Sequence, residues 1–571
     1  MNADFSSRRP AGQRAHVKGE ASVPLWDLTI GDMLAKRAGE YPQREALISQ
    51  HQNQRFTYAQ LAQQVDRLAA GLLSLGLQKG DRLGIWSPNC SEWILCQFAT
   101  ARIGVILVNV NPAYRLGELE YALNQVQCRA LVLATRYKSS DYVAMIGQLA
   151  PELRNMSAGE IALAKLPHLK HVILLGEKIG DFCGVQSFDA LMQCGQAEHF
   201  AQLDECSRQL GADDAINIQF TSGTTGAPKC ATLTHRNIVN NAYFVTGALK
   251  FTEQDRLCLP VPLYHCFGMV MGSLGCIAHG ACMVLPSPVF DAGACLRALQ
   301  DYQCTAVYGV AAMFVALLGQ EVDDAAFAQL RTGIMAGGPC PAEIMAQVME
   351  RMNLREITIA YGMTETSPVS FQSDVDDSVE RRLHTVGRIH PHVEVKLVDE
   401  QEETVGVGET GEIWTRGYSV MQGYWGDEET TRESITPDGW MRTGDLGEMD
   451  AEGYLAIVGR LKDMIIRGGE NVYPREVEEF LYRHPGIEMV QVFGVPSQKY
   501  GEEVCAWVIV KDGQELNGEQ VKDFCRQKIT HFKIPSIVRI VDEFPMTVTG
   551  KPQKNVMRRM MCEEMGVSED G

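Results

Sequence analysis

Segments with helical periodicity alternate with short apolar segments over the first 135 residues, and this alternation constrains the fold more than any other feature. Apolar residues recur at helical spacing over 58–75, after Thr57, which is suited to cap a helix. Residues 82–86 have a strand pattern, 92–102 a helical pattern and 105–110 again a strand pattern. Strands separated by helices in this way predict a parallel sheet with helices packed on its faces.

The same alternation returns in the middle of the chain, where strands are expected near 215–220, 304–309, 332–336 and 356–361. Each strand ends at a polar or glycine-rich segment, and these segments are 221–229, 309–310, 337–339 and 362–365. Ligands of open α/β sheets bind beyond the carboxyl ends of the strands. The four segments are therefore expected to converge on one cleft.

The 571 residues are too many for a single hydrophobic core, because such cores stop growing at roughly 250–300 residues. After about residue 390, short strands broken by Gly and Asp indicate an antiparallel β module, and from about 461 a smaller α+β unit follows. We therefore expect a disordered N-terminus over 1–24, a large α/β domain over 25–460 and a small domain over 461–571. The segment 459–463 is the expected hinge.

The segment 221–229, Thr-Ser-Gly-Thr-Thr-Gly-Ala-Pro-Lys, carries the strongest chemical signal. Glycines let backbone N–H groups form a concave nest, hydroxyls add donors and the lysine adds a mobile positive charge, which together suit a triphosphate. The spacing differs from that of a Walker A loop. A flexible surface loop is the alternative, and the buried strand pattern directly before the segment disfavours it.

Three further segments carry polar side chains that suit a nucleotide site. Residues 361–365 combine a tyrosine ring, a hydroxyl and the carboxylate of Glu365, and a carboxylate beside phosphates indicates Mg²⁺ between them. Asp445 could accept hydrogen bonds from ribose hydroxyls, although an Asx residue that stabilises a tight turn explains it equally well. Lys551 lies on a glycine-containing turn, where a lone lysine is usually just solvated.

The segment 406–411 matches the dinucleotide fingerprint Gly-x-Gly-x-x-Gly. A helix should follow that fingerprint, whereas residues 412–415 have a strand pattern. The segment is therefore predicted to be a hairpin turn.

In this order along the chain, the segments resemble the adenylate-forming superfamily of acyl-CoA synthetases, firefly-type luciferases and adenylation domains. The resemblance extends from about residue 25 to about residue 560, and it rests on the segments 221–229, 361–365, 442–445, 459–463, 468–471 and 549–551. It implies a large domain of stacked α/β subdomains plus a β module, closed by a small mobile lid that swings about Lys462. It also implies an ATP-dependent acid:thiol ligase that forms an acyl-adenylate and pyrophosphate, then transfers the acyl group to coenzyme A with release of AMP.

The resemblance implies a role for individual residues. It assigns the ATP phosphates to Thr221, Ser222, Gly223, Thr224, Thr225, Gly226, Ala227, Pro228 and Lys229. It assigns the rest of the nucleotide to Gly337, Gly338, Pro339, Tyr361, Gly362, Met363, Thr364, Asp445 and Arg460. Thr224 and Glu365 would hold Mg²⁺, Lys551 would bridge the substrate carboxylate and the α-phosphate, and His265 would line the acyl pocket as its gate. Lys462 would be the hinge, and Gly468 and Gly469 would let the narrow arm of coenzyme A pass.

The class of acid depends on residues 257–290, which include no Asp, Glu, Lys or Arg and so suit an apolar acyl chain. Amino-acid-activating relatives place an aspartate near the gate, which this run lacks. Gly268, Gly272 and Gly275 would leave room either for an acyl chain or for close helix packing. A medium-chain fatty acid is favoured; an aryl acid, a luciferase-like reaction and a CoA-independent acyl-AMP-forming enzyme are the alternatives.

The formal net charge of −19 argues against nucleic acid or an anionic membrane as the main partner, because both require a positive surface. The uncharged run 257–290 is broken by prolines, so no integral membrane span is expected. The 17 cysteines include no Cys-x-x-Cys pair and indicate reduced thiols in the cytoplasm. Arg8, Arg9, Arg14 and Lys18 also fit a transit peptide to the mitochondrial matrix, the less favoured compartment. The sequence is compatible with a homodimer.

Overall fold

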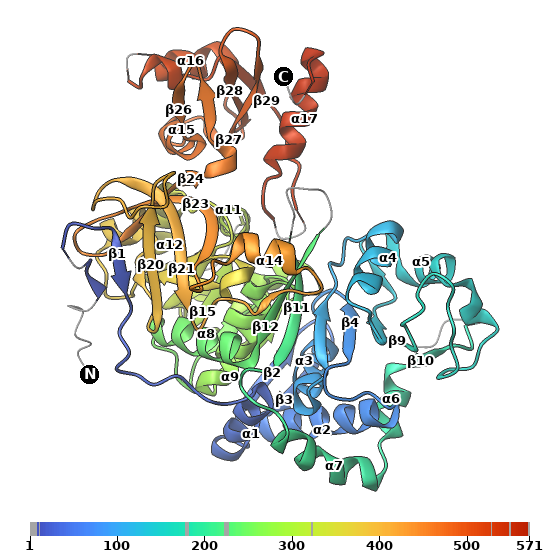
Figure 1. Cartoon of the computed structure of the whole chain (residues 1–571). Helices are drawn as coiled ribbons and strands as arrows, with labels where there is room; N and C mark the ends of the chain where they lie inside the picture. Colours follow the sequence, from blue (N-terminus) through green and yellow to red (C-terminus); the bar gives the residue numbers. More distant parts are fainter. Residues whose placement is uncertain are drawn as a thin grey trace.

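The computed structural model describes residues 8–10, 12–176, 182–221, 228–320, 324–526, 528–547 and 550–568. A small C-terminal domain sits on a large N-terminal domain (Figure 1). The N-terminal domain contains an eight-stranded, a nine-stranded and a five-stranded sheet, and the C-terminal domain contains another five-stranded sheet. This is the α/β organisation that the alternating sequence pattern predicts.

The eight-stranded sheet has the order β10-β9-β6-β4-β5-β11-β12-β22. Its strands are β4 (Arg82–Trp86), β5 (Ile106–Asn109), β6 (Ala130–Leu133), β9 (His171–Leu174), β10 (Val185–Ser187), β11 (Ala215–Thr221), β12 (Lys229–Thr234) and β22 (Gly423–Tyr424). β4 pairs in parallel with β5 and β6, as the sequence predicts. β12 then runs antiparallel to β11, so the chain folds back on itself at the segment that resembles a phosphate loop.

The nine-stranded sheet has the order β19-β18-β17-β16-β15-β13-β14-β2-β3. Its strands are β2 (Glu45–Ser49), β3 (Gln54–Thr57), β13 (Arg256–Cys258), β14 (Cys282–Leu285), β15 (Ala306–Gly309), β16 (Thr332–Ala336), β17 (Glu356–Gly362), β18 (Val369–Gln372) and β19 (Arg388–Ile389). β15, β16 and β17 are parallel neighbours, so the segments that follow them meet at one edge of the sheet.

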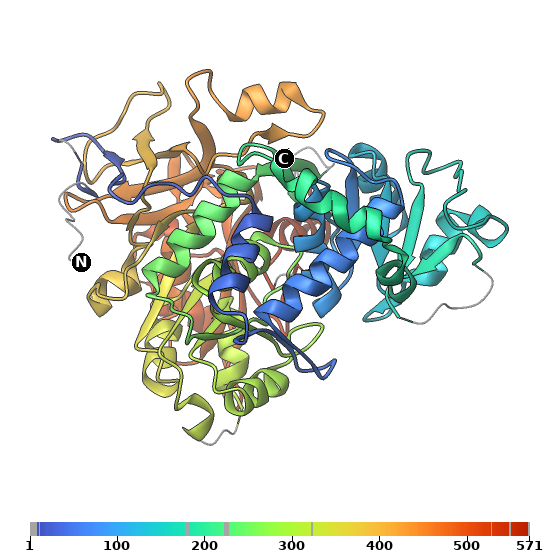
Figure 2. The same cartoon turned by 90° about the horizontal axis from the view of Figure 1, so that it is seen from below.

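Helices cover both of these sheets. Thr57 caps α2 (Tyr58–Ser74) in a capping box with Gln60, and α3 (Ser91–Ile103) packs between α2 and β5. Seen from below, the N-terminal helices in blue and α8 in green lie across the near side of the molecule (Figure 2). The other helices of this domain are α1 (Ile30–Glu40), α4 (Leu116–Gln125), α5 (Tyr142–Leu149), α6 (Phe188–Cys194), α7 (Ala197–Arg208), α8 (His235–Ala248), α10 (Ala292–Asp301), α11 (Ala311–Leu318), α12 (Ala342–Arg351), α13 (Val379–His384) and α14 (Glu428–Ser434).

The uncharged run 257–290 forms buried structure within the N-terminal domain. It comprises the end of β13, a π-helical segment η3 (Phe267–Leu274), α9 (Gly275–His279) and β14. Every residue of η3 is buried. Within the described part of the chain, no helix combines the length and the apolar character needed to cross a bilayer.

The three glycines of this run are packed tightly. A methyl group added to Gly268 would lie 2.3 Å from the carbonyl oxygen of Pro262, and one added to Gly272 would lie 2.4 Å from Leu259 Cδ1. At Gly275 the added methyl would lie 2.5 Å from a threonine methyl. Real carbon atoms do not approach so closely, so these glycines serve close packing, and an acyl tunnel at their positions is the wrong alternative.

The β module is an antiparallel sheet of order β1-β20-β21-β23-β24. Its strands are β1 (His16–Lys18), β20 (Val393–Val398), β21 (Thr410–Gly417), β23 (Met441–Met449) and β24 (Leu455–Arg460). The expectation of disorder over 1–24 is wrong for β1, because backbone pairing with β20 holds this segment. The segment 406–411 ends the connection between β20 and β21 with a turn, in which the Glu409 N–H donates to the Gly406 carbonyl, and it includes the first two residues of β21. A strand follows the segment, and not the helix of a dinucleotide fingerprint.

The C-terminal domain packs helices on both faces of its own sheet. Its elements are β25 (Ile465–Arg467), β26 (Glu470–Val472), α15 (Pro474–Leu481), β27 (Ile487–Ser497), β28 (Gly501–Val510), α16 (Gly518–Cys525), β29 (Ile537–Ile540) and α17 (Lys554–Met565). One apolar cluster includes Val477 of α15 and Val521 of α16, and a second includes Trp507 and Met557 of α17. The domain therefore has its own hydrophobic core.

Candidate active site

A buried carboxylate lies where the eight-stranded and nine-stranded sheets meet. Glu365 is 5% exposed, in a 3₁₀ turn η5 (Thr364–Thr366) that follows β17. Its Oε1 accepts hydrogen bonds from Thr221 Oγ1 and from the Tyr424 hydroxyl, each at 3.0 Å. Burial and the neighbouring Glu365 raise the pKa of Tyr424, which keeps its hydroxyl a donor. The end of β11, the turn after β17 and the edge strand β22 therefore meet at one carboxylate.

The segment that resembles a phosphate loop begins and ends beside this carboxylate. Thr221 and Lys229 are directly paired residues of β11 and β12. Lys229 Nζ lies 5.1 Å from the centre of the Tyr424 ring, in cation–π geometry. Ser222, Gly223, Thr224, Thr225, Gly226 and Ala227 lie outside the described residues. The flanking residues place a lysine and a hydroxyl at the mouth of the loop.

A second buried carboxylate joins the nine-stranded sheet to the β module. Asp445 of β23 is 7% exposed, and its Oδ2 accepts a 2.8 Å hydrogen bond from the Tyr361 hydroxyl. Its Oδ1 lies 3.1 Å from Nε of Arg460, the directly paired residue of β24. Burial raises the pKa of Asp445, and Arg460 and Tyr361 oppose that shift. The Asx-turn interpretation is wrong, because Asp445 lies within a strand and its carboxylate contacts other elements.

Lys551 of the C-terminal domain reaches into the N-terminal domain. A methyl group added to Gly337, which follows β16, would lie 3.6 Å from Lys551 Cε. Burial and the positive charge of Arg460 lower the pKa of Lys551 to about 8, and Asp445 opposes the shift. Burial and the charge of Lys551 also lower the pKa of His265 to about 3, so this histidine is neutral. The lysine that the sequence pattern alone would leave solvated is therefore half-buried among the predicted site residues.

Backbone contacts hold the turn that carries Lys551. The Lys551 N–H donates to Thr547 Oγ1 at 2.9 Å, and the Thr547 N–H donates to the Lys551 carbonyl at 2.7 Å. A methyl group added to Gly550 would lie 3.1 Å from a side-chain carbon of Val310. The turn thus packs against the segment that follows β15. Thr549 lies outside the described residues.

Residues 34–425 match the sequence profile described as "AMP-binding enzyme", and residues 476–551 match that of the "AMP-binding enzyme C-terminal domain". The chain belongs to the AMP-binding enzyme family. It is 47% identical to the mitochondrial medium-chain acyl-CoA ligase ACSF2 of Danio rerio over 99% of this chain and 94% of that protein. It is 45% identical to the putative acyl-CoA synthetase YngI of Bacillus subtilis (strain 168), over 95% of this chain and 98% of the relative.

A solved AMP-binding enzyme has a similar structure throughout. The anthranilate CoA ligase AuaEII, in complex with anthranoyl-AMP, superposes with a TM-score of 0.83 at 25% identity. The match covers 96% of this chain and 99% of that chain. Both domains of this AMP-binding enzyme thus have counterparts in a known acid:CoA ligase.

Several predicted residues of the AMP-binding enzyme lie apart from these contacts. Lys462 is exposed in a 3₁₀ turn η6 (Leu461–Asp463) directly after β24. Gly468 and Gly469 form the exposed turn between β25 and β26, with φ angles of 63° and 87° that favour glycine. The exposed residues Gly338 and Pro339 follow β16, and exposed Gly362 is the last residue of β17, directly before Met363 and Thr364.

Sequence reasoning missed three side chains that support this site. Tyr424 binds Glu365, as described above. Asn89 Oδ1 accepts from the Leu263 N–H at 2.8 Å, and Asn109 Nδ2 donates to the Tyr264 carbonyl at 3.0 Å, so two amides hold the segment before His265. Asn109 ends β5, and a polar residue at a buried strand end is a signal that could have identified it.

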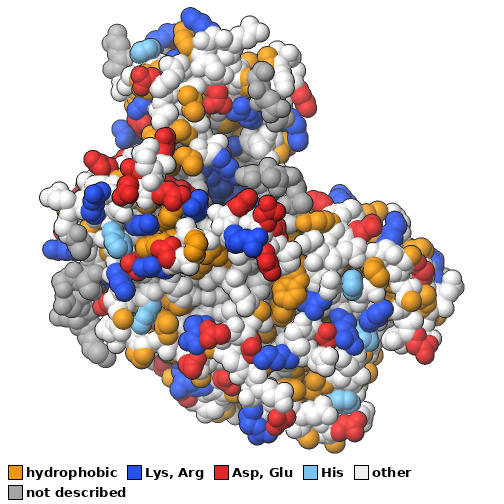
Figure 3. All heavy atoms as spheres, viewed as in Figure 1, with side chains coloured by type: hydrophobic (Ala, Val, Ile, Leu, Met, Phe, Trp, Pro, Cys, Tyr) orange, Lys and Arg blue, Asp and Glu red, His pale blue; other side chains and the backbone are white. Residues whose placement is uncertain are grey.

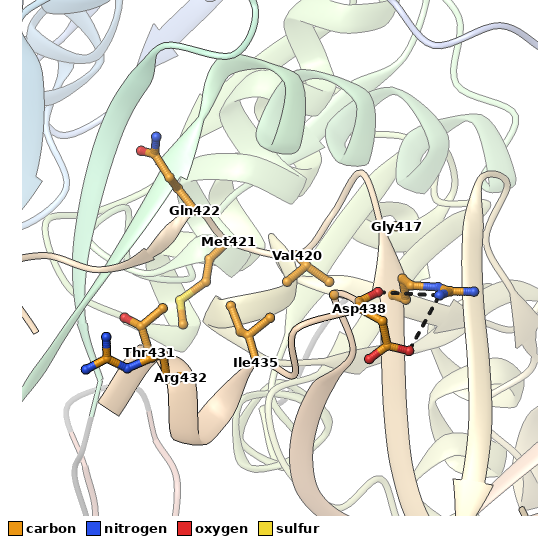
Figure 4. A pocket seen from close by; sticks show the side chains of 10 residues that line it. Gly417, Val420, Met421, Gln422, Thr431, Arg432, Ile435 and Asp438 are labelled. Atoms are coloured by element: carbon orange, nitrogen blue, oxygen red, sulfur yellow. Dashed lines mark hydrogen bonds and ion pairs between the residues drawn. The ribbon is translucent and has the colours of Figure 1, made fainter. Parts of the chain in front are cut away.

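A separate surface pocket of about 460 Å³ lies beside the β module. Figure 4 shows Gly417 and Asp438 on one side of it and Thr431 and Arg432 on the other. One of its two cations, Arg416, is already paired, with Nη2 2.8 Å from Glu394 Oε2. None of the predicted site residues lines this pocket, so it is distinct from the site around Lys551.

Proposed function

We propose that this chain is an acyl-CoA synthetase that converts a fatty acid and ATP into acyl-AMP and pyrophosphate, then transfers the acyl group to coenzyme A. The observation that carries the proposal is the placement of half-buried Lys551 beside Asp445, Arg460 and Gly337. A lysine from a separate domain, inserted into a site that also contains a phosphate-type loop, suits a reaction between two anions. The names of the two relatives support the acid:CoA chemistry.

The proposed ATP contacts follow from the elements that meet at the site. Lys229 and the loop 222–227 would bind the β- and γ-phosphates, because nests of N–H groups and lysine suit phosphate oxygens. Asp445 would accept hydrogen bonds from the ribose hydroxyls, and Arg460 opposes the rise in the pKa of Asp445 that burial causes. Gly337 and Tyr361 would flank the adenine.

Lys551 would act on the first half-reaction. A carboxylate oxygen attacks the α-phosphorus, the bond from that phosphorus to the bridging oxygen breaks, and pyrophosphate leaves. The attack brings two anions together, so an ammonium group between them stabilises the charge that grows in the transition state. Burial strengthens this electrostatic effect, because the ammonium group is shielded from water.

The second half-reaction needs another face of the C-terminal domain. After pyrophosphate leaves, rotation about Lys462 would withdraw Lys551 and present the turn of Gly468 and Gly469. The thiolate of coenzyme A attacks the acyl carbon, and AMP leaves with one former carboxylate oxygen. The exposed position of Lys462 between β24 and β25 supports a hinge role, because few contacts oppose rotation there.

The residues around Glu365 suit Mg²⁺. The ion takes one or two carboxylates together with phosphate oxygens and water, and Glu365 is a buried carboxylate whose partners are hydroxyl groups rather than a cation. Glu365 would hold the ion with Thr224, and the bound ion would offset the charge of the leaving pyrophosphate.

We propose a medium-chain fatty acid as the substrate, with an aryl acid second. The relative from Danio rerio is named as a medium-chain ligase, whereas the solved structure AuaEII is named as an anthranilate ligase. The higher identity to the former favours a fatty acid. The buried apolar segment around Phe267 and Met269 next to neutral His265 supports an apolar acyl group.

A panel of acids tests the proposed function. Pyrophosphate release would be measured with fatty acids from acetate to stearate, benzoate-type acids and amino acids, each with and without coenzyme A. We expect the highest kcat/KM with a medium-chain fatty acid, and AMP release only when coenzyme A is present. Preference for an aryl or amino acid would overturn the acid class, and equal turnover without coenzyme A would overturn the thiol step.

The proposed role of Lys551 predicts a pH dependence. The charged ammonium is present below its pKa of about 8 and is lost as the pH rises through that value. Because kcat/KM reports ionisations of the free enzyme, kcat/KM for adenylate formation should fall on the alkaline side with a midpoint near 8. The check is pyrophosphate release at constant ionic strength. In Lys551→Arg the guanidinium stays charged, so any residual activity should lose this alkaline limb; an unchanged limb would contradict the assignment.

We propose the cytoplasm as the compartment and retain the mitochondrial matrix as the alternative. Buried thiols such as Cys258 and Cys276 suit either reducing compartment. Charges of both signs are interspersed on the face seen in Figure 3, as is common for soluble enzymes. Imaging of the full chain with a C-terminal tag would distinguish the two compartments.

A further inference from the structure

An ion pair between a buried carboxylate and a half-buried lysine lies at the base of the turn that carries Lys551. Glu478 of α15 is 3% exposed, and its Oε1 lies 2.6 Å from Lys554 Nζ. The same oxygen accepts a 2.8 Å hydrogen bond from the Val492 N–H of β27. Lys554 is the first residue of α17. The pair therefore links α15, β27 and the start of α17.

Backbone contacts restrict the conformation of the segment between this ion pair and Lys551. The Gln553 N–H donates to the Pro545 carbonyl at 2.8 Å, and Met546 and Pro552 form an isolated antiparallel bridge. With the contacts between Lys551 and Thr547, these bonds close a hairpin. Lys554 stands at its base and Lys551 near its tip, so a displacement of the base moves the tip.

The ion pair holds the base more firmly than a surface pair could. Glu478 is buried, so moving Lys554 away would leave an uncompensated carboxylate in a low-dielectric interior. The remainder of α17 is fixed elsewhere, through Arg558 Nη1 at 2.7 Å from Glu502 Oε1 and through buried Met557 and Met561. Loss of the pair would thus release the hairpin base while the helix body stays docked.

We propose that the Glu478–Lys554 ion pair is a positioning element that sets how deep Lys551 reaches into the N-terminal domain during adenylate formation. This inference rests on the proposed function. Lys554 is a positioning residue, because its charge is compensated by Glu478 and it acts through the hairpin. The second half-reaction uses another face of the domain, so it does not depend on the pair.

The test uses Lys554→Met in the full chain, which keeps the length of the side chain and removes its charge. Pyrophosphate release measures adenylate formation, and supplied acyl-AMP measures thioester formation. We expect kcat for adenylate formation to fall by about 10-fold to 10²-fold, as for a small misplacement of a catalytic group. KM for ATP and the rate of thioester formation should change by less than about twofold, and Lys554→Arg should restore most of kcat.

Lys533→Met is the matched control. Lys533 lies 2.6 Å from Glu476 in the same domain, but that glutamate side chain is 50% exposed. We expect the control to leave both half-reactions unchanged, because exposed pairs contribute little. If Lys554→Met does not fold, as judged by circular dichroism, the double variant Glu478→Gln with Lys554→Met removes both charges and takes its place.

Two results would overturn the inference. Equal losses in both half-reactions would show that the pair only stabilises the domain, and wild-type adenylate formation in the folded variant would show that it is not needed. Failure of the proposed function would look different, because the unaltered chain would then release no pyrophosphate with any acid.

Discussion

Replacing Lys551 by alanine should slow adenylate formation by at least roughly 10²-fold, while thioester formation from supplied acyl-AMP stays within about threefold of the unaltered enzyme. The ammonium group is the half-buried cation that the C-terminal domain contributes beside Asp445 and Gly337. Its removal leaves the repulsion between substrate carboxylate and α-phosphate without an offset. Pyrophosphate release checks the expected loss in adenylate formation, and acyl-CoA formation from supplied acyl-AMP checks the second half-reaction separately.

Lys533→Ala is the control for Lys551→Ala. Lys533 belongs to the same domain and pairs with Glu476 rather than reaching the site. It should leave both half-reactions unchanged. Equal damage to both half-reactions in Lys551→Ala would remove the assigned role, because a residue used only for adenylation cannot slow a step that starts from acyl-AMP.

Replacing Lys462 by proline should have the opposite effect, with thioester formation slowed by roughly 10²-fold and adenylate formation retained. Lys462 lies in the exposed turn between β24 and β25, where a rotation of the C-terminal domain would change the backbone angles. Proline fixes φ near −65° and restricts the preceding residue, so it opposes such a rotation. Single-turnover assays with preformed acyl-AMP check the expected loss.

Lys462→Ala separates the hinge effect from the loss of the lysine side chain. Alanine leaves the backbone free to rotate, so this variant should keep both half-reactions within a few-fold of the unaltered enzyme. Unimpaired turnover with coenzyme A in Lys462→Pro would remove the case for a moving C-terminal domain. Loss of both half-reactions in the proline variant would instead indicate that the turn is needed for folding.

Helices and strands were predictable where a single hydrophobic periodicity dominates the segment. The strand predicted over 82–86 coincides with β4, and the strand expected near 332–336 coincides with β16. β1 escaped prediction because it has three residues, of which only Val17 is buried, and the pairing with β20 that stabilises it lies far along the chain. Short edge strands depend on partners that no local pattern reveals.

The polar contacts of the site were only partly predictable. The resemblance to the adenylate-forming superfamily pointed to Asp445, Arg460 and Lys551. Considered alone, Asp445 could have been a residue that stabilises a turn, and Lys551 a solvated lysine on the surface. Tyr424 belongs to a two-residue strand that gives no periodic signal, so its bond to Glu365 could not be foreseen. Long-range contacts of this kind depend on tertiary packing rather than on local propensity.

The glycines of the uncharged run show a different limit of sequence reasoning. Their helical spacing indicates that a face of small residues exists, but not what fills the space beside it. In the structure, Leu259 and the carbonyl of Pro262 occupy that space next to Gly272 and Gly268. We therefore expect the acyl group to lie beside His265 and the side chains around it rather than beside these glycines.

Transfer of an oxygen isotope from the acid to AMP tests acyl-adenylate formation most directly. The enzyme would turn over a medium-chain acid labelled with ¹⁸O in both carboxylate oxygens, together with ATP, Mg²⁺ and coenzyme A. Mass spectrometry of the products should find one labelled oxygen in AMP and none in pyrophosphate, because a carboxylate oxygen attacks the α-phosphorus and leaves with it. Label in pyrophosphate or inorganic phosphate, with unlabelled AMP, would contradict adenylate formation.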